Sequence, residues 1–202
     1  CALPILPRGF EEIAAALDAD RALARHFLSR VKMLFYAAAG LSQPVWDRLH
    51  RVAEEICGER ILMITGLGMT ETSPFAICAN WEAGRSGLIG IPAPGLELKL
   101  APVDDKLEAR YRGPNVTPGF WRQPELTRTA FDEEGFYRSG DAVRFADPAS
   151  PDKGLMFDGR IAENFKLDSG SWVSVGPLRA RIIAAGAPYV QDVVICGLNQ
   201  RD

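Results

Sequence analysis

The sequence has few of the residues from which metal sites and disulfide frameworks are built. It holds two histidines, His26 and His50, in segments with helical spacing among arginines, so we expect both at the surface or at helix ends. No two cysteines form a Cys-x-x-Cys pair, and a reducing cytosol is the simplest compartment for such a chain. The four cysteines are Cys1, Cys57, Cys78 and Cys196.

Long apolar runs and an excess of basic charge are also missing. No apolar run approaches the roughly 18 residues of a membrane span, and no secretory signal pattern opens the chain. The 23 basic and 26 acidic side chains give a net charge of −3, whereas a nucleic-acid binder usually has a basic stripe. We therefore expect a cytoplasmic protein whose partners include neither nucleic acid nor a membrane.

The chain lacks an initiator methionine. It starts inside the apolar segment "CALPILPRGF" and stops at "NQRD", just after "VVICGL". Its 202 residues are enough for one large domain or parts of two. We expect a fragment of a longer protein.

The first 80 residues alternate between helical and strand-like patterns. Phe10, Ile13, Ala14 and Leu17 share one face at helical spacing. Two short apolar runs, "VKMLFY" and "RILMIT", predict buried strands on either side of a second amphipathic segment that starts near Ser42 and stops at Gly58. Strand, helix and strand in this order favour a right-handed crossover and a parallel pair.

The pattern changes near Trp81. Short apolar or alternating runs separated by Gly and Pro continue to Phe157 and predict an antiparallel β-subdomain over residues 81–160. After Arg160, "SWVSV", "GPLRARIIAAG" and "VQDVVICGL" predict a strand, a short helix and another strand. We place a domain boundary near 158–162, with a second domain over 161–202.

In the stretch "ITGLGMTETSP", Ile64–Pro74, the predicted strand ends at Thr65, and two glycines, three hydroxyls and a carboxylate follow it. Glycines let backbone approach a ligand closely, the Thr70 hydroxyl can contact a phosphate, and Glu71 offers a hard oxygen that suits Mg²⁺. The alternative is a glycine turn with a Ser73–Pro74 helix cap, and the stretch alone favours it. It is not a Walker loop, because no Gly-Lys-Ser/Thr follows.

Three further segments have similar alternatives. Asp141 in "FYRSGDAVRF" could accept two hydrogen bonds from a ribose diol, or complete a tight turn. Arg160 and Lys166 in "DGRIAENFKLDSG" could face phosphate or ribose, or lie on a solvated surface. Phe120 and Trp121 in "RGPNVTPGFWRQPE" could line a pocket, although core packing is the simpler interpretation.

The order and spacing of these motifs are more specific than any single motif. "GLGMTETSP", "RGPNVTPGFWRQPE", "GFYRSGDAVRF" and "DGRIAENFKLDSGSWV" follow one another as in the adenylate-forming superfamily, which the chain resembles over nearly its whole length. That superfamily includes acyl-CoA synthetases, luciferases and peptide-synthetase adenylation domains. "LPRGF", "DGRIAENFKL" and "WVSVGPLRARI" look most like feruloyl-CoA synthases.

The resemblance implies an α/β fold class, a partial adenylate-forming enzyme fold. Residues 1–160 would be the C-terminal portion of the large AMP-binding domain, with an α/β part (1–80) and a β-barrel-like subdomain (81–160). Residues 161–202 would begin the small α+β C-terminal domain. Because the truncated sheets would leave unpaired edges, we expect the chain to form a homo-oligomer.

The resemblance also implies an ATP-dependent acid–thiol ligase. A carboxylic acid, expected to be aromatic and similar to ferulate, attacks the α-phosphate of ATP and gives an acyl-adenylate, after which CoA displaces AMP. Mg²⁺ would act as Lewis acid and template. The alternatives are transfer of the acyl group to a carrier protein or a reductase, and a non-catalytic nucleotide-binding module.

Residue roles follow from the matching motifs. Thr70 would contact the α-phosphate and Glu71 would hold Mg²⁺, while Asp141, assisted by Arg160, would bind the ribose hydroxyls. The residues implied to line the adenine and acyl pocket are Ala38, Ala39, Gly40, Gly66, Leu67 and Gly68. Leu67 stands where the superfamily usually has an aromatic ring, so stacking on adenine is lost but apolar contact remains.

The resemblance places Lys166 and Gly170 on a loop that faces the active site in the thioester-forming orientation. Ala162 falls at the hinge about which the small domain rotates. The superfamily's phosphate loop and its C-terminal catalytic lysine have no counterpart in the sequence. Since both supply positive charge to the transition state, we expect this polypeptide alone not to adenylate at a useful rate.

Overall fold

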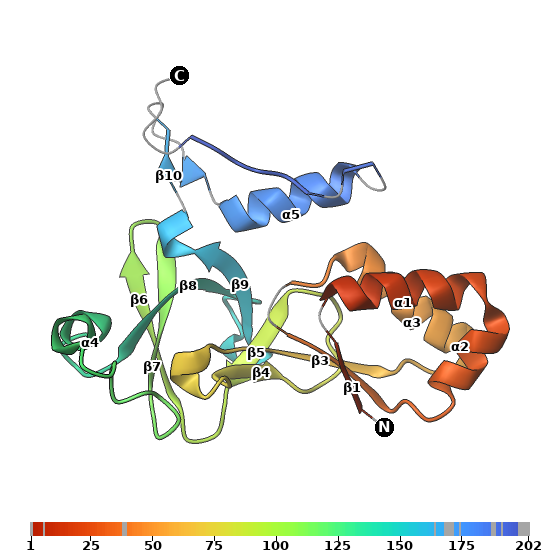
Figure 1. Cartoon of the computed structure of the whole chain (residues 1–202), viewed down its shortest axis with the longest axis horizontal. Helices are drawn as coiled ribbons and strands as arrows, with labels where there is room; N and C mark the ends of the chain where they lie inside the picture. Colours follow the sequence, from red (N-terminus) through yellow and green to blue (C-terminus); the bar gives the residue numbers. More distant parts are fainter. Residues whose placement is uncertain are drawn as a thin grey trace.

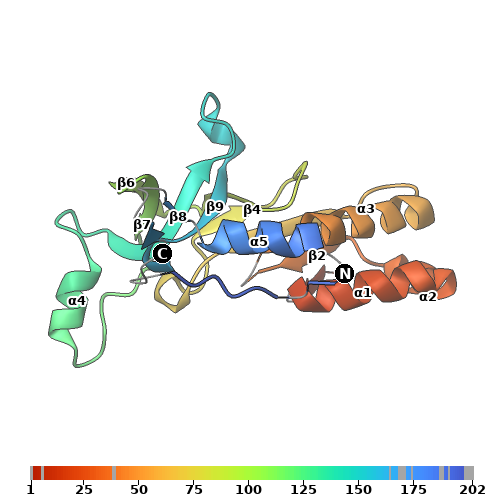
Figure 2. The same cartoon turned by 90° about the horizontal axis from the view of Figure 1, so that it is seen from above.

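The computed structural model describes residues 2–5, 7–37, 40–163, 165–167, 172–173, 175–186, 189–190 and 192–197. Nine of the described strands form one sheet in the order β1-β2-β3-β4-β5-β9-β8-β7-β6. Helices α1–α3 gather at one end of the molecule, and β6–β9 lie with α4 toward the other end (Figure 1). The outline seen from above is elongated, with α2 and α4 at opposite extremes (Figure 2).

The first part of the sheet is parallel and confirms the predicted strand pair. Strands β1 (Ala2–Ile5), β2 (Met33–Tyr36) and β3 (Leu62–Leu67) run in the same direction, with Met33 opposite Leu62. Helices α1 (Pro7–Ala19), α2 (Arg21–Leu28) and α3 (Gln43–Cys57) pack on one another. Helix α3 lies between β2 and β3 in the chain, as a crossover requires.

Local sequence signals account for the helix ends and the buried faces. The carboxylate of Asp20 accepts hydrogen bonds from the backbone N–H groups of Ala22 and Leu23, at 2.8 and 3.0 Å, and so caps α2. Gly58 ends α3 in the left-handed conformation, with φ of 75°. On α1, the predicted face carries Phe10, Ala14 and Leu17 into the core.

The prediction for His50 was wrong, whereas His26 is exposed as expected. His50 is only 5% exposed and lies edge-on to Trp46, with ring centroids 4.0 Å apart. Burial, aided by the charge of Arg60, lowers its pKa, which favours the neutral imidazole. Arginines next to a histidine in the sequence do not decide whether it is exposed, because exposure depends on which face of the helix the histidine occupies.

The second part of the sheet is antiparallel and contains most of the predicted β-subdomain. Strand β4 (Ile77–Ala79) pairs antiparallel with β3, and β5 (Leu88–Pro92) pairs with both β4 and β9 (Leu155–Arg160). Strands β6 (Glu97–Val103), β7 (Lys106–Arg112) and β8 (Tyr137–Phe145) complete the sheet, and α4 (Pro124–Ala130) lies between β7 and β8 in the chain. The α/β fold class is therefore confirmed.

The residues after Arg160 confirm only part of the prediction. Strands β10 (Phe165–Lys166) and β11 (Trp172–Val173) pair antiparallel, and helix α5 (Val175–Gly186) contacts β9. The strand expected in "VQDVVICGL" was wrong, because residues 192–197 are not in a strand and Val194 is 84% exposed. A strand needs backbone partners, and no described strand pairs with this segment. The boundary near 158–162 stays a prediction.

Among the described residues, no helix combines the length and the apolar character that crossing a membrane requires.

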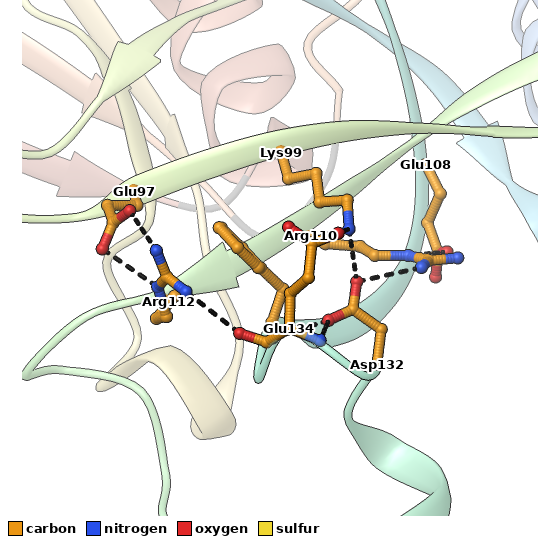
Figure 3. A network of polar contacts seen from close by, with 8 residues as sticks. Glu97, Lys99, Glu108, Arg110, Arg112, Asp132 and Glu134 are labelled. Atoms are coloured by element: carbon orange, nitrogen blue, oxygen red, sulfur yellow. Dashed lines mark hydrogen bonds and ion pairs between the residues drawn. The ribbon is translucent and has the colours of Figure 1, made fainter.

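A network of ion pairs holds β6, β7 and the turn before β8 together (Figure 3). The side chain of Asp132, only 5% exposed, lies 3.0 Å from Lys99 Nζ and 3.1 Å from Arg110 Nη1. Burial acts to raise the pKa of Asp132, but hydrogen bonds from the backbone N–H of Phe136, from Lys99 and from Arg110 outweigh it. The pKa of this carboxyl is therefore held well below its usual range.

We expect Asp132→Asn to lower the free energy of unfolding by about 2 kcal/mol, because the mostly buried guanidinium of Arg110 loses one of its two carboxylate partners and keeps only Glu108. Since the folded-state pKa is depressed, this contribution is complete above the unfolded value of 3.8 and is lost as pH falls below it. Urea unfolding at pH 7 and pH 3 checks both statements. Asp147→Asn, at an exposed pair with Lys153, is the matched control and should cost less. Equal losses for the two variants would contradict the expectation.

Candidate active site

A pocket opens where the parallel and antiparallel parts of the sheet meet. It has about 750 Å³ of empty space, including its open mouth. Strands β2 and β3 lead into it at their carboxyl ends, the usual place for a ligand in an open α/β sheet. The residues that line it are Tyr36, Gly40, Thr65, Gly66, Leu67, Gly68, Met69, Gly87, Leu88, Ile89, Asp141, Phe157 and Arg160.

The fold brings six of the predicted site residues to this pocket, from widely separated parts of the chain. The predicted residues among its lining are Gly40, Gly66, Leu67, Gly68, Asp141 and Arg160. Thr70 and Glu71 do not line the pocket, but Met69, the residue before them, does. Both belong to the single turn η1 (Thr70–Thr72). The functional roles assigned to these residues stay predictions.

Other predicted positions cannot be placed. Ala38, Ala39 and Gly170 lie outside the described residues. Lys166 belongs to β10, but its side chain is also outside the described part. Ala162, the predicted hinge, lies in the short turn η3 (Ile161–Glu163) directly after β9.

The glycine pair has a reason that lies within the fold. A Cβ on Gly68 would come within 1.5 Å of the Pro74 carbonyl oxygen, and one on Gly66 within 2.8 Å of the Ile77 oxygen. The returning chain of the β3–β4 connection therefore occupies the space that a side chain would need. The helix cap considered for Ser73–Pro74 was wrong, since no helix follows and Ser73 itself has φ of 57°.

Asp141 is a buried carboxylate with one cationic partner. Its side chain is 4% exposed, and Oδ1 lies 3.0 Å from Nη1 of Arg160, which also donates to the Ser139 carbonyl at 3.1 Å. Burial raises the pKa of Asp141 to about 6, opposed by Arg160 and assisted by the charges of Glu108 and Glu163. The carboxylate is mainly ionised at neutral pH and can accept hydrogen bonds from a ligand in the pocket.

Glu71 fits a magnesium ion only when a ligand supplies further oxygens. Its half-buried carboxylate makes no hydrogen bond or ion pair with the described residues, and no cluster of three metal-binding side chains occurs among them. Mg²⁺ is commonly bound by one or two carboxylates together with substrate phosphates and water. One carboxylate beside a nucleotide phosphate meets that requirement, and one carboxylate alone does not.

Several pocket residues were missed in the sequence. Tyr36 ends the quoted run "VKMLFY" and Phe157 ends the region of short apolar runs, but nothing in their spacing assigned them to the pocket. Tyr36 is buried, which raises the pKa of its hydroxyl. The expectation of core packing was right for Phe120, which packs against the hydrophobic core of the antiparallel part of the sheet. It was wrong for Trp121, which is 83% exposed.

Comparisons with known proteins agree with this geometry. The family described as "AMP-binding enzyme" matches residues 2–121. A medium-chain fatty-acid–CoA ligase from Escherichia coli (strain K12) is 36% identical over 122 residues, 54% of this chain and 20% of that protein. The chain spans between about a fifth and a third of the length of curated relatives that it matches.

Two solved structures support the same relationship. A malonyl-CoA ligase in a ternary product complex with methylmalonyl-CoA and AMP is 30% identical, with a TM-score of 0.64 over 97% of this chain and 41% of that one. An anthranilate CoA ligase in complex with anthranoyl-AMP is 25% identical, with a TM-score of 0.69 over 95% of this chain and 35% of that one. With more than half of its residues matched by the family, and with the motif residues around one pocket, the chain belongs to the AMP-binding enzyme family.

Proposed function

We propose that the chain is part of an ATP-dependent acid–thiol ligase, which forms an acyl-adenylate and then a CoA thioester. The observation that carries the proposal is the buried carboxylate of Asp141, paired with the partly exposed Arg160, beside a pocket at the carboxyl ends of β2 and β3. A carboxylate in that place accepts two hydrogen bonds from a ribose diol. Family membership and similarity to CoA ligases support the same class.

Each group in the pocket has a task in this proposal. Asp141 holds the nucleoside by its ribose, and Arg160 keeps that carboxylate ionised and in place. The backbone of Gly66–Gly68 and the side chain of Leu67 form the wall against which the base and the acyl group lie. Thr70 and Glu71 face the phosphates, and Mg²⁺, when bound at Glu71, supplies neutralising charge there. Asp141 and the pocket therefore fix the nucleoside, while the η1 turn acts on its phosphates.

We propose an aromatic carboxylic acid similar to ferulate as the substrate. The support is the resemblance of "DGRIAENFKL" and "WVSVGPLRARI" to feruloyl-CoA synthases, together with the aromatic and aliphatic lining contributed by Tyr36, Leu88 and Phe157. Solved relatives include one that binds an aromatic acyl-adenylate, anthranoyl-AMP. A carrier-protein thiol in place of CoA is the alternative acceptor. A cytoplasmic location and self-association stay predictions.

Titration calorimetry with non-hydrolysable acyl-adenylate analogues tests the function and the substrate together. We expect the feruloyl analogue to bind the chain at least about tenfold more tightly than AMP, because the acyl group buries further apolar area. Analogues carrying an octanoyl and a malonyl group are the controls, and both should bind more weakly than the feruloyl analogue. Equal affinity for all three would remove the aromatic assignment, and no binding of AMP or any analogue would contradict the proposed function.

A further inference from the structure

The segment "RGPNVTPGFWRQPE" contains a contact that connects it to the Thr70–Glu71 turn. Asn115 lies between β7 and α4, far along the chain from the turn. Its Nδ2 group donates one hydrogen bond to the Thr72 carbonyl oxygen, at 3.0 Å, and another to the Phe75 carbonyl oxygen, at 2.6 Å. Both hydrogens of the side-chain amide are thereby used.

Two further hydrogen bonds connect the same two segments. Ser73 Oγ donates to the Asn115 carbonyl oxygen at 2.9 Å. The backbone N–H of Thr117 donates to the Glu71 carbonyl oxygen at 2.8 Å. Four hydrogen bonds therefore join residues 71–75 to residues 115–117.

The turn needs support of this kind. Within the turn, the hydroxyl and the N–H group of Thr72 form hydrogen bonds with the backbone of Met69. These bonds close η1 but do not attach it to the antiparallel part of the sheet. Ser73 adopts a left-handed conformation, with φ of 57°, that a non-glycine residue keeps only when its surroundings hold it there. The Asn115 amide holds the carbonyl groups on both sides of that residue.

The side chains of Thr70 and Glu71 depend on this backbone for their position. Thr70 is exposed, Glu71 is half-buried, and neither side chain makes a hydrogen bond or ion pair with the described residues. The path of the turn therefore decides from where the hydroxyl and the carboxylate extend. Asn115 itself does not line the pocket.

We propose that Asn115 is a positioning residue, whose amide holds the Thr70–Phe75 turn so that Thr70 and Glu71 meet a nucleotide phosphate and its magnesium ion. The inference rests on the proposed function, since it assigns the turn to phosphate binding. Asparagine fits this position because two nearby carbonyl oxygens need two hydrogen-bond donors, and its short side-chain amide supplies both. Aspartate has the same shape and no donor when ionised, and glutamine is one methylene longer.

The first experiment compares Asn115→Asp and Asn115→Ala with the unaltered chain in binding adenosine and ATP with Mg²⁺, by calorimetry. We expect adenosine affinity to stay within about twofold, because Asp141 and the pocket wall are untouched. Affinity for ATP with Mg²⁺ should fall about tenfold, as expected when hydrogen bonds that order the contacting groups are lost. Thr129→Ala, which removes a hydroxyl on the exposed surface of α4, is the control and should change neither.

The second experiment measures amide hydrogen exchange and needs no ligand. We expect faster exchange at Thr72, Ser73 and Phe75 in Asn115→Asp, because their N–H groups bond within the turn that Asn115 holds. Exchange in β2 and β8 should be unchanged, which excludes general loss of the fold.

The outcomes separate the two proposals. Equal loss of adenosine and ATP affinity, or unchanged ATP affinity in Asn115→Asp, overturns the role of Asn115 while leaving the proposed function standing. If the unaltered chain binds neither ligand, the proposed function fails, and the exchange rates alone decide whether Asn115 holds the turn.

Discussion

Replacing Asp141 with asparagine should lower the affinity of the chain for AMP about a hundredfold. The carboxylate can accept a hydrogen bond from each of the two ribose hydroxyls, and a hydrogen bond to a charged group contributes about 1.5–3 kcal/mol to the binding free energy. Asparagine keeps the shape but offers one acceptor oxygen and no charge. Loss of one such bond and weakening of the other sum to about 3 kcal/mol, which corresponds to roughly two orders of magnitude in affinity.

Calorimetric titration with AMP and with 2′,3′-dideoxy-AMP assigns the loss to the ribose. The unaltered chain should bind the dideoxy nucleotide much more weakly than AMP, whereas Asp141→Asn, which keeps one weakened hydrogen bond, should distinguish the two far less. Asp147→Asn, an exposed aspartate paired with Lys153, is the matched control and should bind AMP normally. If Asp141→Asn still prefers AMP by the full factor, the carboxylate is not the ribose contact.

The raised pKa of Asp141 adds a pH signature to this prediction. Adenosine affinity should fall as pH drops through about 6, because the protonated carboxyl has lost its charge and one acceptor. Adenosine replaces AMP in this test because the phosphate of AMP itself titrates at about pH 6. The stability of the unliganded chain should move in the opposite direction. The folded-state pKa lies above the unfolded value of 3.8, so the folded chain binds the proton more tightly and this group stabilises it more as pH falls from above 6 toward 3.8. Both trends should disappear in Asp141→Asn.

Gly68→Ala should destabilise the fold by more than about 3 kcal/mol. The added methyl would lie 1.5 Å from the Pro74 oxygen and 2.3 Å from its carbonyl carbon, and these are backbone atoms that a rotamer change cannot move. The β3–β4 connection would have to open, and strain of this kind belongs to the few mechanisms that give large losses. Chemical denaturation, monitored by tryptophan fluorescence, measures the loss.

Gly84→Ala is the control for this substitution, because a Cβ there meets nothing within 4 Å. It should change stability by less than about 1 kcal/mol in either direction. The comparison also separates two explanations of the glycine pair. If Gly68→Ala folds as stably as Gly84→Ala and loses only nucleotide affinity, the glycine serves the ligand and not the chain's own packing.

Periodicity in the sequence predicted which face of an element is buried, but not always which residues stay exposed. The face of Phe10, Ala14 and Leu17 was predicted correctly because apolar residues at helical spacing must share one side of a helix. Apolar character alone failed at Trp121, where core packing was expected of an aromatic side chain, and in "VQDVVICGL", where an apolar run was expected to be a strand; Trp121 and Val194 lie at the surface. Burial there depends on whether another part of the chain covers the residue, and no local pattern records that.

The candidate site was likewise predicted only in part. Ordered motifs indicated Gly66–Gly68, Asp141 and Arg160 as members of one site, and these residues meet at one pocket. The motifs gave no sign that Gly68 faces the Pro74 carbonyl, or that Asn115 reaches the Thr72 and Phe75 carbonyls. Such contacts join segments distant in sequence, and their partners are backbone atoms that every residue possesses.

The sequence by itself determined the family, the alternation of helices and strands in the first 80 residues, and the residue types available for nucleotide chemistry. Those properties depend on side-chain identity and local spacing, which are written along the chain. The tertiary structure alone decided that Asp141 is buried against Arg160, that the glycine pair makes room for returning backbone, and that the Thr70–Glu71 turn is held from outside. Each of these depends on which segment, distant in the sequence, packs against the residue, and only folding brings the two together.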